Sequence, residues 1–132
     1  PPLPPIDPRS FGSRVRASAP LFMHQGSEHV IRVSVTNRSP VAWEPTERSG
    51  VILAARWRRL RNRIDPFYLD GRLHLEKAIA PGERAWFDLP VRVPMYGLPM
   101  RLEIDLVEDG MQWFAPFGGY MAKNLVIPLP PR

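Results

Sequence analysis

The sequence contains no cysteine among its 132 residues. This absence excludes disulfides, thiolate nucleophiles, cysteine-based zinc fingers and iron–sulfur clusters. Histidine is scarce as well, because the three present, His24, His29 and His74, stand in separate segments without the spacing of a metal site. We therefore expect no metal site and no cofactor.

Long hydrophobic runs are also missing. No apolar stretch approaches the roughly 18 residues that a membrane-spanning helix requires. Residues 1–10 have neither the basic nor the apolar region of a secretory signal. These features predict a chain without a transmembrane segment, located in the cytoplasm.

Residues that could form a catalytic site do not converge. No glycine-rich phosphate loop is present, since Gly118-Gly119 is followed by neither a lysine nor a helical pattern. Glu103 and Asp105 would lie about 7 Å apart on one strand face, a spacing that paired carboxylates of glycosidases also use. Such pairs are common on the polar face of a strand, so a structural, hydrogen-bonding role of Asp105 is favoured. We expect no catalytic residue and no enzymatic activity of the isolated domain.

Proline is strongly over-represented, with 17 in the chain against a usual share of about 5%. Prolines crowd both ends, where they supply no amide donor to extend a sheet. We interpret residues 1–10 as an N-terminal linker, 11–128 as the folded domain and 129–132 as a C-terminal linker. Such ends are typical of a module within a longer protein.

Between these ends, apolar and polar residues alternate with the period of two that half-buried strands show. The alternation is clearest in Glu28–Asn37, Glu83–Val93 and Leu98–Glu108. Val51–Trp57 is apolar at nearly every position, which predicts a central strand covered on both faces. A helix from Leu53 to Ile64 is the alternative, but arginines fall on all its sides. The weaker strand candidates are Ser13–Ser18, Leu69–Leu75, Gln112–Ala115 and Lys123–Leu129.

Turn signals divide the chain in the same way. Asp70-Gly71 and Asp109-Gly110 predict tight reversals, and Pro81-Gly82 predicts a type II turn. About seven to nine short strands indicate an all-β fold, an immunoglobulin-like antiparallel sandwich of two sheets.

The alternation turns Arg101, Glu103 and Asp105 outward. It turns Leu98, Met100 and Leu106 inward and predicts one shared core containing Val33, Phe87, Val91, Leu102 and Ile104.

Three stretches resemble immunoglobulin-like modules of bacteria. The run from Val35 to Ser39, followed by Trp43, is similar to a segment that ends one strand and starts a bend in those modules and in the related four-tryptophan domain of autophagy receptors. The bacterial modules accompany glycosyltransferases and sugar-modifying methyltransferases of surface-polysaccharide synthesis. The other two similar stretches are Asp70-Gly71-Arg72-Leu73 with Ile79–Glu83, and Leu102–Gly110 with Trp113-Phe114. The resemblance implies this fold and structural roles for Asn37, Trp43, Asp105 and Trp113.

Four tryptophans are present, and a buried tryptophan is usual in a sandwich. Trp57 fits the residue that fills the space between the sheets, and Trp113 with Phe114 is expected to close a hairpin at one end of the core. Trp86 differs, because strict alternation turns it outward. An exposed indole among directed polar groups suits the stacking of a sugar ring and equally suits a protein interface. The candidate ligand-binding residues are Arg84, Trp86, Asp88 and Arg92.

Arginine outnumbers lysine by 16 to 2, and the net charge is +5. Five arginines fall within eight residues, which predicts a local positive patch: Arg56, Arg58, Arg59, Arg61 and Arg63. This patch could be a solvated or interdomain face, or it could contact an anionic polysaccharide, a lipid-linked phosphate or another anionic surface. Nucleic acid is disfavoured, because no recognised nucleic-acid motif accompanies the run.

The sequence thus favours a non-catalytic carbohydrate-binding or positioning module of a bacterial surface-polysaccharide biosynthesis protein, of the O-antigen type. The alternative is a protein-interaction or oligomerisation module with no sugar binding. The expected partner is a glycan in the first case and a protein or neighbouring domain in the second.

Overall fold

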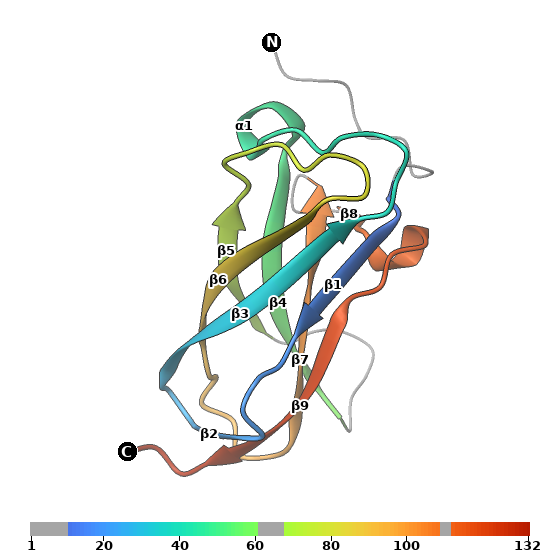
Figure 1. The fold of residues 1–132 in the computed structure, drawn as a ribbon. Coiled ribbons are helices and arrows are strands. Elements are labelled where there is room, and N and C mark those ends of the chain that lie inside the picture. Colours follow the sequence, from blue (N-terminus) through green and yellow to red (C-terminus); the bar gives the residue numbers. More distant parts are fainter. Residues whose placement is uncertain (1–10, 61–67, 109–111) are drawn as a thin grey trace.

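Two β-sheets pack face to face in the computed structural model, which describes residues 11–60, 68–108 and 112–132 (Figure 1). One sheet has three strands in the order β1-β3-β6, and the other has the order β2-β9-β7-β4-β5, with β8 paired to β7. The all-β sandwich predicted from the sequence is therefore confirmed. The elements are β1 (Ser13–Ala17), β2 (Phe22–His24), β3 (Glu28–Asn37), α1 (Thr46–Ser49), β4 (Val51–Arg59), β5 (Tyr68–His74), β6 (Arg84–Arg92), β7 (Met100–Glu108), β8 (Gln112–Trp113), the 3-10 turn η2 (Ala115–Phe117) and β9 (Ala122–Leu129).

Every strand predicted from alternation is present, with bounds within a few residues. Three short elements were not predicted, β2, α1 and η2, because three or four residues are too few to show a period. The strand pairings are antiparallel among the described strands except for β2 with β9, which run parallel. The prediction of mostly antiparallel strands is therefore confirmed, with one parallel pair at this edge. No helix in the described part of the chain is long and apolar enough to cross a membrane.

The expected reversal at Asp70-Gly71 is wrong. Gly71 lies inside β5, where the pairing with β4 shifts register between Ala54 and Arg56. Its φ of 86° belongs to a bulge rather than to a hairpin turn. The Pro81-Gly82 turn is confirmed, since Gly82 has φ 82° and the amide of Glu83 donates to the carbonyl of Ala80. Asp109-Gly110 lies outside the described residues.

The core between the sheets contains the predicted residues. Val33, Val91, Leu102 and Ile104 are buried, whereas Phe87 packs against them and stays partly exposed at the open edge of β6. Trp43 and Trp57 are fully buried, and the ring of Trp43 meets that of Phe114 edge-on at 5.6 Å.

The outer side of β7 departs from the expectation. Glu103 and Asp105 turn away from the core, as alternation requires, but both are buried rather than solvated. The reason is that β7 lies between β4 and β9, and β8 pairs with its end, so neighbouring side chains and the hairpin cover its outer face. Leu98 was expected to point inward and is instead exposed, because it precedes the start of β7 at Met100.

Candidate functional site

The outer face of the three-stranded sheet carries the exposed tryptophan. Strand register places Trp86 of β6 opposite Ser34 of β3, which in turn lies opposite Arg16 of β1. The indole is 53% exposed, so the outward orientation predicted from alternation is confirmed. The adjacent row across the sheet contains Arg84 and Arg14 with Thr36 between them.

An exposed ion pair lies against the indole of Trp86. The guanidinium of Arg32, on the neighbouring strand, lies 5.2 Å from the ring centroid of Trp86, a cation–π contact. The same guanidinium is 3.2 Å from Oδ1 of Asp88. One side of the ring is therefore occupied by a positive group, while about half of the indole surface remains open to solvent.

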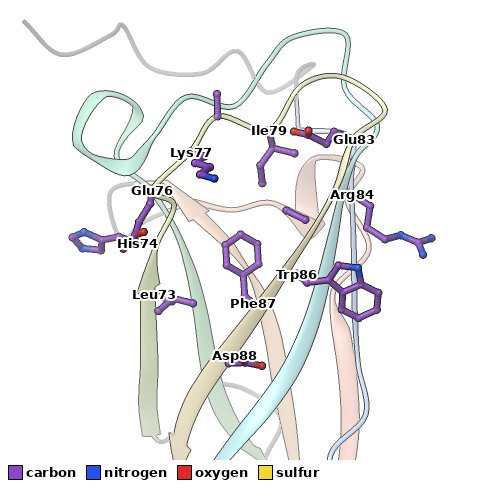
Figure 2. Close-up of a pocket in the computed structure, with 12 residues that line it drawn as sticks. Leu73, His74, Glu76, Lys77, Ile79, Glu83, Arg84, Trp86, Phe87 and Asp88 are labelled. Carbon is purple, nitrogen blue, oxygen red and sulfur yellow. The ribbon is translucent and has the colours of Figure 1, made fainter.

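A cleft of about 440 Å³ opens on the other side of β6, at the edge of the sandwich facing β5. Figure 2 shows Phe87 directed into this cleft, whereas Trp86 and Arg84 point away from it across the strand. The apolar lining comes from Leu73, Ile79, Ala85 and Phe87, and the charged or polar lining from His74, Glu76, Lys77, Glu83 and Asp88. Trp86 forms part of the rim and thus joins the cleft to the outer sheet face.

The cleft lies beyond a close approach of β5 to β6 at Gly71. Gly71 of β5 lies so close to β6 that a Cβ atom there would be 2.7 Å from the carbonyl oxygen of Pro90. The residues lining the cleft are C-terminal to Gly71 on β5 and N-terminal to Pro90 on β6. The gap between β5 and β6 is therefore closed at Gly71 and open along the residues that line the cleft.

The four candidate residues on β6 do not form one site. Arg84 and Trp86 share the open region, and Asp88 serves as the partner of Arg32. Arg92 lies at the far end of the strand, about 20 Å from Trp86 by strand rise, where it pairs with Glu28 and donates to the carbonyl of Gly26. Arg92 is thus separated from the indole.

Sequence inspection missed a second group of arginines around the same face. A depression of about 440 Å³ is lined by Arg14, Arg16, Arg38 and Tyr120. A second depression brings Arg16 together with Arg84 and Trp86. We call Arg14, Arg16, Arg38 and Arg84 the sheet-face arginines. They are distant in sequence, so only the strand register brings them together.

Charge repulsion is visible in this group. The pKa of Arg14 is lowered, first by the positive charge of Arg16, then by partial burial and by Arg38. Arg84 acts in the same direction. Among the described residues, no carboxylate forms an ion pair with any sheet-face arginine.

The predicted patch on β4 has a different character. Arg56 and Arg58 share a face, as expected, but both bind the buried carboxylate of Glu103, at 2.7 and 3.2 Å from Oε1. Arg101 contributes a third ion pair, with Nε 3.0 Å from Oε2. Burial alone would raise the pKa of Glu103, but the hydrogen bond and charge of Arg56 bring that pKa below its ordinary value. These arginines are therefore largely covered and share a carboxylate.

The rest of the patch is divided. The guanidinium of Arg59 lies 5.4 Å from the ring of Tyr96, and that of Arg56 lies 4.1 Å from the ring of Trp113. Arg61 and Arg63 lie outside the described residues.

Because its ring contacts Arg56, Trp113 packs on the outer side of the sheet instead of closing the core, while its neighbour Phe114 is fully buried.

The remaining motif residues have structural contacts. The side chain of Asn37 accepts hydrogen bonds from the amide and hydroxyl of Ser39 and donates to the carbonyls of Val41 and Ile79. This network forms the bend after β3. Asp105 accepts from the amides of Leu106 and Ala115, both at 2.8 Å, which fixes the turn after β8. No group of three or more potential metal ligands occurs in the part of the chain that the structure describes.

Comparisons with known proteins bear on the fold. No protein-family model matches the sequence, and no curated protein matches it. The CARDB domain of the PF1109 protein from Pyrococcus furiosus is similar in structure, both in a crystal structure in complex with di-metal ions and in a solution NMR structure. Both structures are 10% identical to this chain, and each match covers 89% of it. The match covers 86% of the crystal-structure chain with a TM-score of 0.55, and 93% of the NMR chain with a TM-score of 0.56.

Red sea bream transglutaminase also contains a similar part. Its structure is 17% identical with a TM-score of 0.53 and covers 89% of this chain, but the match spans only 15% of the transglutaminase. Sequence identities this low show a shared fold alone. The immunoglobulin-like β-sandwich predicted from the sequence is confirmed by these similarities.

Proposed function

We propose that this domain is a non-catalytic binding module that holds a bacterial surface polysaccharide on the Trp86 face, beside the enzymes that build the polymer. The observation that carries the proposal is the half-exposed indole of Trp86, contacted by Arg32 and flanked by a cleft of about 440 Å³. Sugar rings stack their C–H faces on such an indole, while polar groups around it take directed hydrogen bonds.

Two further features support a binding role without turnover. Glu103, the first of the carboxylates considered for catalysis, is held by three arginines. Asp105, the second, is occupied by two backbone amides. Neither carboxylate lines the cleft beside Trp86.

A glycan array of bacterial polysaccharides tests the proposal. We expect the chain to bind at least one polysaccharide and Trp86→Ala to abolish or strongly weaken that binding. Leu125→Ala is the control, because Leu125 is 48% exposed on β9, in the other sheet. A chain that binds no glycan, or one for which both variants behave like the parent, would contradict the proposal.

The second candidate function is a protein interface. It is favoured by the apolar lining of the cleft, where Phe87 is partly exposed next to Trp86, since aromatic anchors in pockets are typical of binding hot spots. Sedimentation analysis separates this function from the first: Trp86-dependent self-association without glycan binding would favour the interface.

A further inference from the structure

The outer face of the three-stranded sheet gathers positive charge, and no carboxylate of the described residues forms an ion pair with it. Arg14 and Arg84 flank Thr36 in one cross-strand row, and Arg16 stands in the next row with Trp86. Arg38 completes the group, as it lines the same depression as Arg14 and Arg16. With strands about 4.8 Å apart, the α-carbons of Arg14 and Arg84 lie about 10 Å from each other.

The other clusters of arginine on the described strands differ in one respect. Arg56, Arg58 and Arg101 surround Glu103, and Arg32 pairs with Asp88. The arginines at these positions therefore have an internal counter-charge. Arg14, Arg16, Arg38 and Arg84 have no ion pair within the described residues, so an external anion that binds them would also relieve their mutual repulsion.

Two aromatic side chains border the sheet-face arginines. Trp86 stands at the β6 side, and Tyr120, 66% exposed, stands beside β1, where its backbone bridges to Arg14. The backbone there is fixed by hydrogen bonds from the amide of Val15 to the carbonyl of Tyr120 and from the amide of Tyr120 to the carbonyl of Ser13, both at 2.8 Å. The strip of arginines is therefore bounded by rings on a rigid sheet.

From this arrangement we infer that the sheet-face arginines bind the carboxylates of an acidic, uronate-bearing polysaccharide whose sugar ring stacks on Trp86. The inference rests on the proposed function and specifies its ligand. Guanidinium groups match carboxylates through paired, charge-assisted hydrogen bonds. Several arginines spread across three strands suit a repeating anion better than a single small one.

Single-stranded nucleic acid is the competing polyanion. Its binding sites usually stack successive bases on several aromatic side chains along a groove. Here the arginines separate Trp86 from Tyr120, so the described face offers one isolated ring at each side. This spacing favours a polymer whose charges, and not its rings, repeat along the strip.

Binding of the intact chain to polygalacturonate, measured by calorimetry, tests the inference, with dextran as the neutral polymer. The test variant is Arg14→Gln/Arg84→Gln. Its control is Arg48→Gln/Arg72→Gln, which removes the same charge from exposed positions on α1 and β5. We expect the test variant to weaken binding at least about tenfold, because each guanidinium hydrogen bond to a carboxylate is lost, and the control to change binding less than about twofold.

Salt provides a second readout that does not depend on a variant. Raising NaCl from 50 to 500 mM should weaken polygalacturonate binding by the parent chain, since exposed charge interactions are screened. Salt-insensitive binding, equal binding of dextran, equal effects of the two double variants, or tighter binding of single-stranded DNA would each overturn the inference. If neutral glycans bind through Trp86 without preference for uronates, the proposed function stands and this inference fails. If no glycan binds, the proposed function itself fails.

Discussion

Nε of Arg56 donates a 2.7 Å hydrogen bond to Oε1 of Glu103, joining β4 to β7 across 47 residues of sequence. The side chain of Glu103 is 3% exposed and that of Arg56 is 14% exposed, so the pair is screened from water. Arg58 and Arg101 complete the cluster around the same carboxylate. A local run of positive charge is thus tied to one acid on the adjacent strand.

Glu103→Gln should destabilise the domain by about 3 kcal/mol, because removing one member of a buried ion pair leaves uncompensated charge. The free energy of unfolding in urea measures the effect. Asp88→Asn is the matched control, since its bridge to Arg32 is 60–62% exposed and should contribute within about 0.5 kcal/mol. Equal effects of the two variants would contradict the burial argument.

Asp105 should make the domain less stable as pH rises from about 4 to about 7. Burial raises the pKa of this carboxyl from 3.8 to about 6, against the lowering effect of the Ala115 and Leu106 amides. The folded state then holds the proton more tightly than the unfolded state, so this stabilisation is complete below the unfolded pKa and lost above the folded one. The full effect is about 3 kcal/mol.

Urea unfolding at several pH values measures this dependence, with Asp105→Asn as the variant that removes it. Glu103 changes stability in the opposite direction: its lowered pKa stabilises the domain above pH 4.5 and loses that contribution as pH falls through the folded value. The difference between the parent and Asp105→Asn should therefore vary between pH 4 and 7. A constant difference across that range would show that Asp105 does not titrate there.

The sequence alone predicts most of the sandwich, because strand alternation is a local property. The ten residues of β3 show the period directly, and the same rule gives the correct orientation of Trp86. Interactions between distant residues could not be predicted in this way. The covering of Glu103 by Arg56 and Arg58 depends on the register of β4 with β7.

In the candidate site, too, local features could be predicted from the sequence and contacts between distant residues could not. Trp86 and Arg84 could be found because they alternate on one strand. Arg14 and Arg38 could not be joined to them, since their proximity depends on the pairing of β1, β3 and β6. Conversely, the dense run from Arg56 attracted attention in the sequence, yet its described members bind an acid or an aromatic ring within the fold.

Two tryptophans provide a direct check of burial and strand phase. Trp57 is fully buried, so Trp57→Ala should cost about 3–5 kcal/mol. Trp86→Ala should change the free energy of unfolding by no more than about 0.5 kcal/mol, as is usual for exposed positions. Urea denaturation of both variants gives the comparison. Severe unfolding of Trp86→Ala would mean that the indole belongs to the core and is no binding surface.

Gly71→Ala should destabilise the domain more than Gly82→Ala does. Both glycines have positive φ, 86° and 82°, so alanine brings a backbone cost of about 1–2 kcal/mol at either position. Only at Gly71 would the new Cβ meet an obstacle, the carbonyl oxygen of Pro90 at 2.7 Å, whereas nothing lies within 4 Å at Gly82. The backbone oxygen cannot turn aside, so β5 must move away from β6, which adds a further cost of about 1–3 kcal/mol.

The difference between the two variants in urea unfolding isolates the close approach of β5 to β6, because the backbone cost cancels. The same displacement should alter the cleft, since the contact between Gly71 and Pro90 closes the end of the cleft nearest to these two residues. If Trp86 binds a ligand together with the cleft, Gly71→Ala should also weaken binding at a temperature where the variant is fully folded, and Gly82→Ala should not. Equal stability of the two variants would mean that the β5 bulge yields freely and that the contact with Pro90 does not shape the site.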